Sequence, residues 1–141
     1  MPDRRTLTVA LHWTNALLLI VLVSGASVPL LFWAFGLTAL AMTGIALGGG
    51  LLGRPGPKLT GMPRRMHPWM HRSLYALLAG VGALTLYAQI GGAVSEAALR
   101  RWYGILLGVS ALHAIFHLWR HTALNDGALR TITPAFLHGN R

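Results

Sequence analysis

The sequence predicts an all-α integral membrane protein, a single domain of four transmembrane helices. Of its 141 residues, 54% are hydrophobic and only 11% are charged, whereas soluble domains carry about 25% charged residues. Four apolar stretches approach the ~20 residues that a helix needs to cross a hydrocarbon core of ~30 Å. We therefore expect most of the chain to lie in the membrane, surrounded by lipid.

The first two predicted spans are joined by a tight turn. The first span covers about residues 7–26, and the second covers about residues 30–53. Pro29 fits the start of the second helix, because a proline in the first turn removes no helical hydrogen bond. Small residues such as Gly36 and Gly44 allow this helix to approach its neighbours closely in lipid.

A polar loop separates these spans from the other two. Residues 54–66 contain four basic residues and three prolines, a composition typical of loops. The third span covers about residues 68–90, and the fourth covers about residues 98–119, after a helix start at Ser95. Residues 120–141 are expected to form a polar tail.

The distribution of basic residues predicts the orientation in the membrane. Arg100 and Arg101 lie on the far side from the N-terminus, and the other ten of the twelve Lys and Arg lie on the N-terminal side. Because basic loops stay in the cytoplasm, both termini are expected to be cytoplasmic. A net charge of +9 would indicate nucleic-acid binding in a soluble protein. Here orientation accounts for the charge, so no nucleic-acid partner is expected.

The first apolar stretch has an alternative interpretation as a cleaved signal peptide. Arg4 and Arg5 before the stretch and Ser24 near its end resemble the regions of such a peptide. His12 and Trp13 interrupt the stretch and favour a retained helix. The chain contains no cysteine, so any metal has to be held mainly by its seven histidines.

All seven histidines fall in the cytoplasmic half of the predicted bundle or on its cytoplasmic surface. His12 lies about five residues inside the first span and His113 about six inside the end of the fourth, so their depths differ by only a few ångströms. Two imidazoles at equal depth on different helices can hold one haem iron in a bundle core. The others are His67, His71, His117, His121 and His138.

The alternative for a histidine near a helix end is a hydrogen bond to backbone or lipid headgroups, without a metal. We expect that role for His67, His121 and His138. His113 and His117 are four residues apart and share a helix face, which is also compatible with a small metal ion.

Several short motifs resemble the bacterial cytochrome b561 family, four-helix membrane proteins with two haems that exchange electrons with quinone. Residues 5–13 resemble the first helix of that family, where a His-Trp pair supplies an iron ligand. His71 with Tyr75 resembles the start of its third helix. His113 and residues 125–130 resemble the end of its fourth helix and the tail beyond. The resemblance extends over nearly the whole chain.

The resemblance implies that His12 and His113 are the axial ligands of a haem b near the cytoplasmic face, through which they bind iron. It also makes His71 and Arg72 candidates for the haem or quinone environment. The candidate partners of the haem propionates are Arg4, Arg5, Arg72 and Arg120. For each arginine, membrane orientation is the simpler explanation of its charge.

The chain departs from the family at the second haem. The positions of its two ligands are occupied here by Phe32, or its neighbour Trp33, and by Leu99. None of these side chains binds iron, so the resemblance implies one haem rather than two.

The expected function is that of a membrane b-type cytochrome of the bacterial inner membrane, which carries electrons at the cytoplasmic side and exchanges them with quinone or a partner redox subunit. One alternative is an accessory subunit of a larger respiratory or redox complex, with a structural or vestigial haem. Another is a metal-binding or transport protein that uses His113, His117 and His121. The sequence indicates no catalytic residues, because it contains no carboxylate pair, nucleophile-base pair or phosphate loop.

Overall fold

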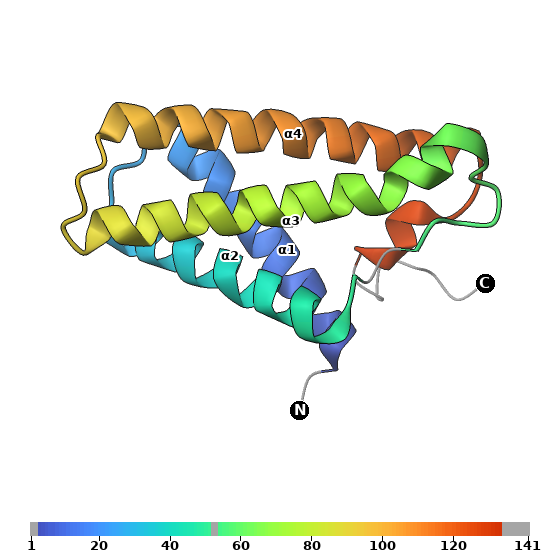
Figure 1. The fold of residues 1–141 in the computed structure, drawn as a ribbon, viewed down its shortest axis with the longest axis horizontal. Coiled ribbons are helices and arrows are strands. Elements are labelled where there is room, and N and C mark those ends of the chain that lie inside the picture. The colour runs from blue at the N-terminus through green and yellow to red at the C-terminus, as the bar shows by residue number, and fades with distance from the viewer. Residues whose placement is uncertain (1–2, 52–53, 134–141) are drawn as a thin grey trace.

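The computed structural model describes residues 3–51 and 54–133, which form four long α-helices and one short 3₁₀-helix, without a β-strand (Figure 1). The prediction of an all-α fold with four long helices is confirmed. The elements are α1 (Arg4–Val23), α2 (Pro29–Gly49), α3 (Gly61–Gln89), α4 (Glu96–Ala123) and η1 (Ala128–Thr131).

Three of these helices, α1, α2 and α4, are long and apolar enough to cross a membrane. α3 has the length, with 29 residues, but its first part is polar. Residues 61–72 contain three arginines and two histidines, and the apolar part of α3 begins only after Arg72. Length and composition therefore support three membrane spans directly.

The largest difference from the predicted boundaries is at the start of α3. This helix begins at Gly61, so the expectation of a loop over residues 54–66 is wrong for its last six residues. The reason is that Pro63 lies in the first helical turn, where the backbone amides have no helical partner and a proline is tolerated. At the same end of the bundle, α4 continues to Ala123, four residues beyond the predicted end.

The starts of α1 and α4 are capped by short polar side chains. Asp3 accepts a hydrogen bond from the Thr6 amide at 2.6 Å, and this bond lowers the pKa of Asp3. Ser95 accepts one from the Ala98 amide at 3.2 Å, which confirms the predicted helix start. Each cap satisfies one of the amides that a helix start leaves without a partner.

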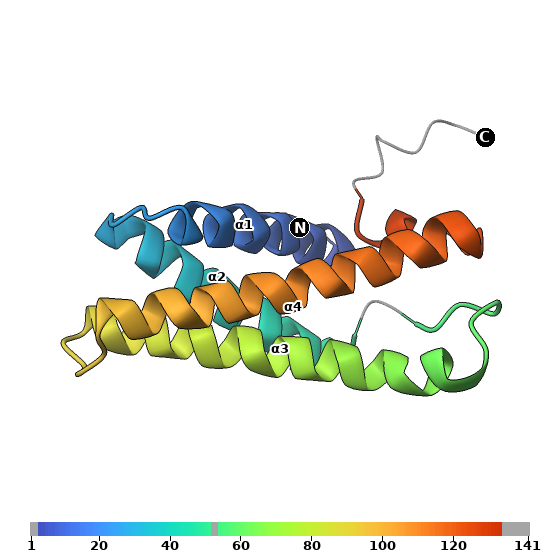
Figure 2. The same cartoon turned by 90° about the horizontal axis from the view of Figure 1, so that it is seen from above.

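The two ends of the bundle carry different connections. The α1–α2 and α3–α4 turns lie at one end, whereas the α2–α3 connection and η1 lie at the other (Figures 1 and 2). α3 and α4 run antiparallel and side by side in both views. Residues that are far apart in the sequence, near the start of α3 and the end of α4, are therefore neighbours.

A core of apolar side chains runs between the four helices. It is built around Leu22 of α1, Phe35 of α2, Val81 of α3 and Leu106 of α4. Many large apolar side chains instead point outward, including Leu17, Leu30, Leu47 and Leu112. Exposure of so many large apolar side chains is typical of contact with lipid or a partner rather than with water.

Glycines allow α2 and α3 to pack closely. A methyl group added at Gly82 would lie 2.8 Å from the Cβ of Ala39, and one added at Gly36 would lie 2.5 Å from the Cγ of Leu86. Distances this short leave no room for a side chain. The expectation that Gly36 permits close helix packing is confirmed, since only a residue without a Cβ fits there. The same expectation for Gly44 is wrong, because a methyl group added there would have no described atom of another helix within 4 Å.

Two polar contacts join helices within the apolar bundle. The Thr38 hydroxyl of α2 donates a hydrogen bond to the Asn15 Oδ1 of α1 at 3.0 Å. The hydroxyls of Thr85 in α3 and Tyr103 in α4 lie 2.9 Å apart. Because the Thr85 hydroxyl donates its only hydrogen to the Val81 carbonyl, Tyr103 is the donor in the second contact. Both contacts satisfy polar groups that would be costly to bury alone.

Candidate functional site

Four histidines meet between α3 and α4, at the end of the bundle that carries η1. α3 supplies His67 and His71, and α4 supplies His113 and His117. The spacing of four residues puts both members of each pair on one helix face. The ring centroids lie 4.3 Å apart for His67 and His71, 4.5 Å for His113 and His117, and 4.8 Å for His71 and His113. We refer to these four residues as the histidine cluster.

The histidine cluster is largely closed to solvent. His67, His71 and His117 are 1%, 8% and 9% exposed, and His113 is half-buried. Within the part of the chain that the structure describes, the buried Nε2 of His67 and Nδ1 of His113 have no hydrogen-bond partner. An unpartnered buried polar group costs about 1–3 kcal/mol. The Nδ1 of His121, outside the cluster, has no partner among these residues either. The two nitrogens inside the cluster leave ligand positions that a further group can take.

The hydrogen bonds of His71 define its protonation. Its Nδ1 lies 2.8 Å from the backbone carbonyl of His67. Because a carbonyl only accepts, the Nδ1 of His71 carries the hydrogen, and in the neutral ring the Nε2 is left with a lone pair. That Nε2 lies 3.2 Å from the Nε2 of His117. Two ring nitrogens thus face each other across the α3–α4 interface.

The two predicted haem ligands lie on different helices that pack together, α1 and α4. His12 is half-buried on α1, and its ring meets that of Trp13 edge-on at 5.8 Å. Trp13 in turn donates a hydrogen bond to the Ile132 carbonyl at 2.9 Å, which ties α1 to the segment after η1.

The predicted propionate partners already have partners within the chain. Arg120 forms a buried ion pair with Asp126: its Nε and Nη2 both lie 2.7 Å from Oδ2, and the two side chains are 3% and 0% exposed. Arg72 lies over the ring of Trp69, 5.5 Å from its centroid. Arg4 donates to the Gly50 carbonyl. The fourth arginine of this kind, Arg5, donates to the Arg130 carbonyl.

The ion pair between Arg120 and Asp126 is packed under the loop before α3. A methyl group added at Gly56 would lie 2.8 Å from the Asp126 Oδ2 and 3.0 Å from the Arg120 Nη2. The Asp126 Oδ1 accepts a further hydrogen bond from the Ala128 amide at 2.9 Å. The beginning of the expected polar tail is therefore part of the bundle rather than free in solvent.

The sequence predicted the positions of only some of the histidines correctly. The shared face of His113 and His117 was recognised from their spacing. His67 was expected near the membrane surface, hydrogen-bonded to backbone or lipid headgroups, but the structure buries it inside the histidine cluster. Its spacing of four residues from His71 was the signal that could have placed it there. His121 is half-buried beside the cluster and lines a separate pocket with residues 125–127 and Arg130. The expectation for His138 concerns a residue outside the described part of the chain.

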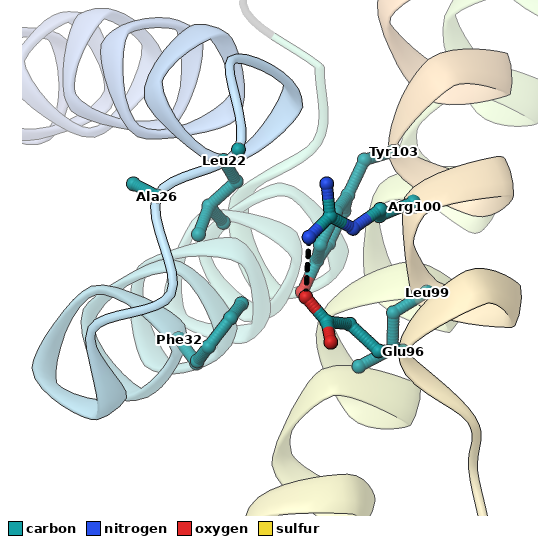
Figure 3. Close-up of a pocket in the computed structure, with 8 residues that line it drawn as sticks. Leu22, Ala26, Phe32, Glu96, Leu99, Arg100 and Tyr103 are labelled. Atoms are coloured by element: carbon teal, nitrogen blue, oxygen red, sulfur yellow. Dashed lines mark hydrogen bonds and ion pairs between the residues drawn. The ribbon is translucent and has the colours of Figure 1, made fainter.

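The positions expected to have lost haem ligands lie at the opposite end of the bundle. Phe32 of α2 and Leu99 of α4 line one small pocket from opposite sides, beside the ion pair of Glu96 and Arg100 (Figure 3). Its cavity is about 20 Å³, which is room for a water molecule and far too little for a porphyrin. The structure thus brings Phe32 and Leu99 to one place, and neither offers a metal ligand.

Comparisons with protein-family models, curated proteins and solved structures find no significant match to this chain. Its function is therefore inferred from the geometry of its own residues.

Proposed function

We propose that this chain is a membrane b-type cytochrome that carries electrons through one haem held by His12 and His113. The observation that carries the proposal is that these two imidazoles lie on α1 and α4, which pack against each other, with the buried Nδ1 of His113 lacking a partner among the described residues. Imidazole is a common axial ligand of haem iron, and cofactors of helix bundles are bound by side chains on facing helices. The donor set therefore fits haem.

The haem would supply one-electron chemistry, cycling between ferric and ferrous iron. The chain's own residues bind and orient it. His12 and His113 would hold its iron through ring nitrogens, and the apolar faces of α1 and α4 would keep water away. The ring of Trp13 packs edge-on against His12 and restricts its orientation. The resemblance of residues 5–13 and 125–130 to the cytochrome b561 family supports the same assignment.

We place the protein in the bacterial inner membrane, with α3 as a fourth span and both termini in the cytoplasm. α3 packs against α2 and α4 along the bundle, so a membrane that α2 and α4 cross has to accommodate α3 as well. The polar residues 61–72 then lie at the cytoplasmic surface, where Arg64, Arg65 and Arg72 satisfy the positive-inside rule.

The electron partner in this proposal is quinone or a redox subunit in the same membrane. Arg72 and the exposed Trp69 form a basic and aromatic surface next to the histidine cluster, which suits a membrane-dissolved or membrane-bound partner. The alternative of an accessory subunit rests on the exposed apolar faces, which fit a partner helix as well as lipid.

The test is the reduced-minus-oxidised spectrum of the full chain, purified in mild detergent from haem-replete cells. We expect about one haem b per chain, lost in His12→Ala and kept in the control His121→Ala. Purification without haem would contradict the proposal. Two haems per chain would contradict the interpretation of Phe32 and Leu99. Isolation as a lone cytochrome that reacts with quinone would exclude the accessory-subunit alternative.

A further inference from the structure

We propose that His67, His71 and His117 form a separate site that binds one divalent transition-metal ion of the zinc class. Each residue offers one ring nitrogen, and the three nitrogens lie within 4.8 Å of one another. All three side chains are more than nine-tenths buried. The site shares no ligand with the proposed haem, although the His113 ring lies 4.8 Å from that of His71 and 4.5 Å from that of His117.

One of the three distances between the ring nitrogens is close to that of a zinc site, and all three are within 4.8 Å. With Zn–N bonds of about 2.05 Å in tetrahedral geometry, two ligand nitrogens lie about 3.3 Å apart. The Nε2 atoms of His71 and His117 are 3.2 Å apart. The ring of His67 has to move closer to the other two for all three nitrogens to reach one ion. Its Nε2 has no hydrogen bond among the described residues that would oppose this movement.

The hydrogen bond of His71 has the form found in metal-bound histidines. Such a histidine usually donates its second ring N–H to a carbonyl or carboxylate, which fixes the ring and directs the other nitrogen at the metal. The Nδ1 of His71 donates to the His67 carbonyl at 2.8 Å, and its Nε2 lone pair points to His117. His71 is therefore held in a metal-binding orientation before any ion arrives.

The chemistry of the donors selects the class of ion. The group consists of imidazoles alone, which suit Zn²⁺, Cu²⁺ and Ni²⁺. Ca²⁺ and Mg²⁺ require oxygen ligands and are excluded. The nearest charged groups, Arg120 and Asp126, neutralise each other in their ion pair. Three histidines leave one coordination position of a tetrahedral ion open for water, as in catalytic zinc sites.

The test is titration of the purified full chain with ZnCl₂ after treatment with a chelator, followed by calorimetry. The protein has to carry a purification tag without histidine. We expect one Zn²⁺ per chain, and a loss of affinity of about 100-fold or more in His67→Ala and in His117→Ala, since even changes beyond the ligands cost 10–100-fold. The control His121→Ala, also on α4, should bind like the wild type.

Two further measurements keep the outcomes distinct. Circular dichroism of the helices shows whether each variant folds. The variant His12→Ala distinguishes the haem site from the zinc site, because it should lose haem and keep zinc. Zinc binding without haem would overturn the proposed function and support the metal site. Absence of stoichiometric zinc binding, or its retention in folded His67→Ala and His117→Ala, would overturn the metal site. Loss of haem in folded His67→Ala would overturn the independence of the two sites.

Discussion

Removal of the Arg120 side chain should destabilise the protein strongly. In Arg120→Met, the carboxylate of Asp126 stays buried with a single hydrogen bond, from the Ala128 amide at 2.9 Å. Both contacts of 2.7 Å to the guanidinium are lost, in a place where the two side chains are 3% and 0% exposed. Breaking a buried ion pair from one side costs about 3–5 kcal/mol, which is roughly a 100- to 4,000-fold increase in the unfolding equilibrium constant.

The matched control is the second ion pair of α4, between Arg100 and Glu96. Its side chains are 55% and 61% exposed, and exposed pairs contribute little because water screens them. Arg100→Met should therefore change the stability hardly at all. The free energy of unfolding is measured in mixed micelles by titration with dodecyl sulfate, followed by circular dichroism.

A double variant separates the charge from the packing. In Arg120→Met with Asp126→Leu, both charges are gone and no uncompensated carboxylate remains. We expect most of the lost stability to return, because buried pairs are often replaceable by apolar residues. Equal losses in Arg120→Met and Arg100→Met, or a double variant as unstable as Arg120→Met, would refute this account of the buried pair.

Two further predictions concern packing and hydrogen bonding between the helices. Gly82→Ala should cost about 1–3 kcal/mol of stability by overpacking against Ala39. Its control Gly80→Ala, with open space around it, should gain about 0.5–1 kcal/mol from helix propensity. Equal stabilities of the two variants in the same micelle titration would contradict close packing at Gly82. Tyr103→Phe should cost about 0.5–1.5 kcal/mol because the donor to Thr85 is lost, and unchanged stability would show that this bond contributes nothing.

The fold was predictable from sequence wherever one local signal dominated. The apolar runs predicted four long helices, and Pro29 and Ser95 marked two of their starts. The start of α3 was missed because prolines and basic residues usually mark loops. Pro63 instead lies in the first turn of α3, where a proline is tolerated. Whether a proline falls in a first turn depends on where the helix begins, and the composition of the segment does not show that.

The candidate site was predictable only within single helices. The spacing of His113 and His117 predicted a shared face, but nothing local predicts which residues of α3 meet that face. That pairing depends on how α3 and α4 pack, and therefore on contacts far away in the sequence. The burial of Asp126 was missed for the same reason, since a polar residue in a tail shows no local sign that it pairs with Arg120.

The buried contact of Thr85 with Tyr103 also determines how far α3 and α4 can slide along each other. Thr85 follows His71 by fourteen residues in α3, and Tyr103 precedes His117 by fourteen residues in α4. The Thr85–Tyr103 and His71–His117 contacts therefore share one register of the antiparallel pair α3 and α4, and they lie about 21 Å apart along the helices. If α3 slid along α4 by one residue, both contacts would be displaced by about 1.5 Å. The hydroxyl contact at one end of the bundle therefore helps to hold the two imidazoles opposite each other at the other end.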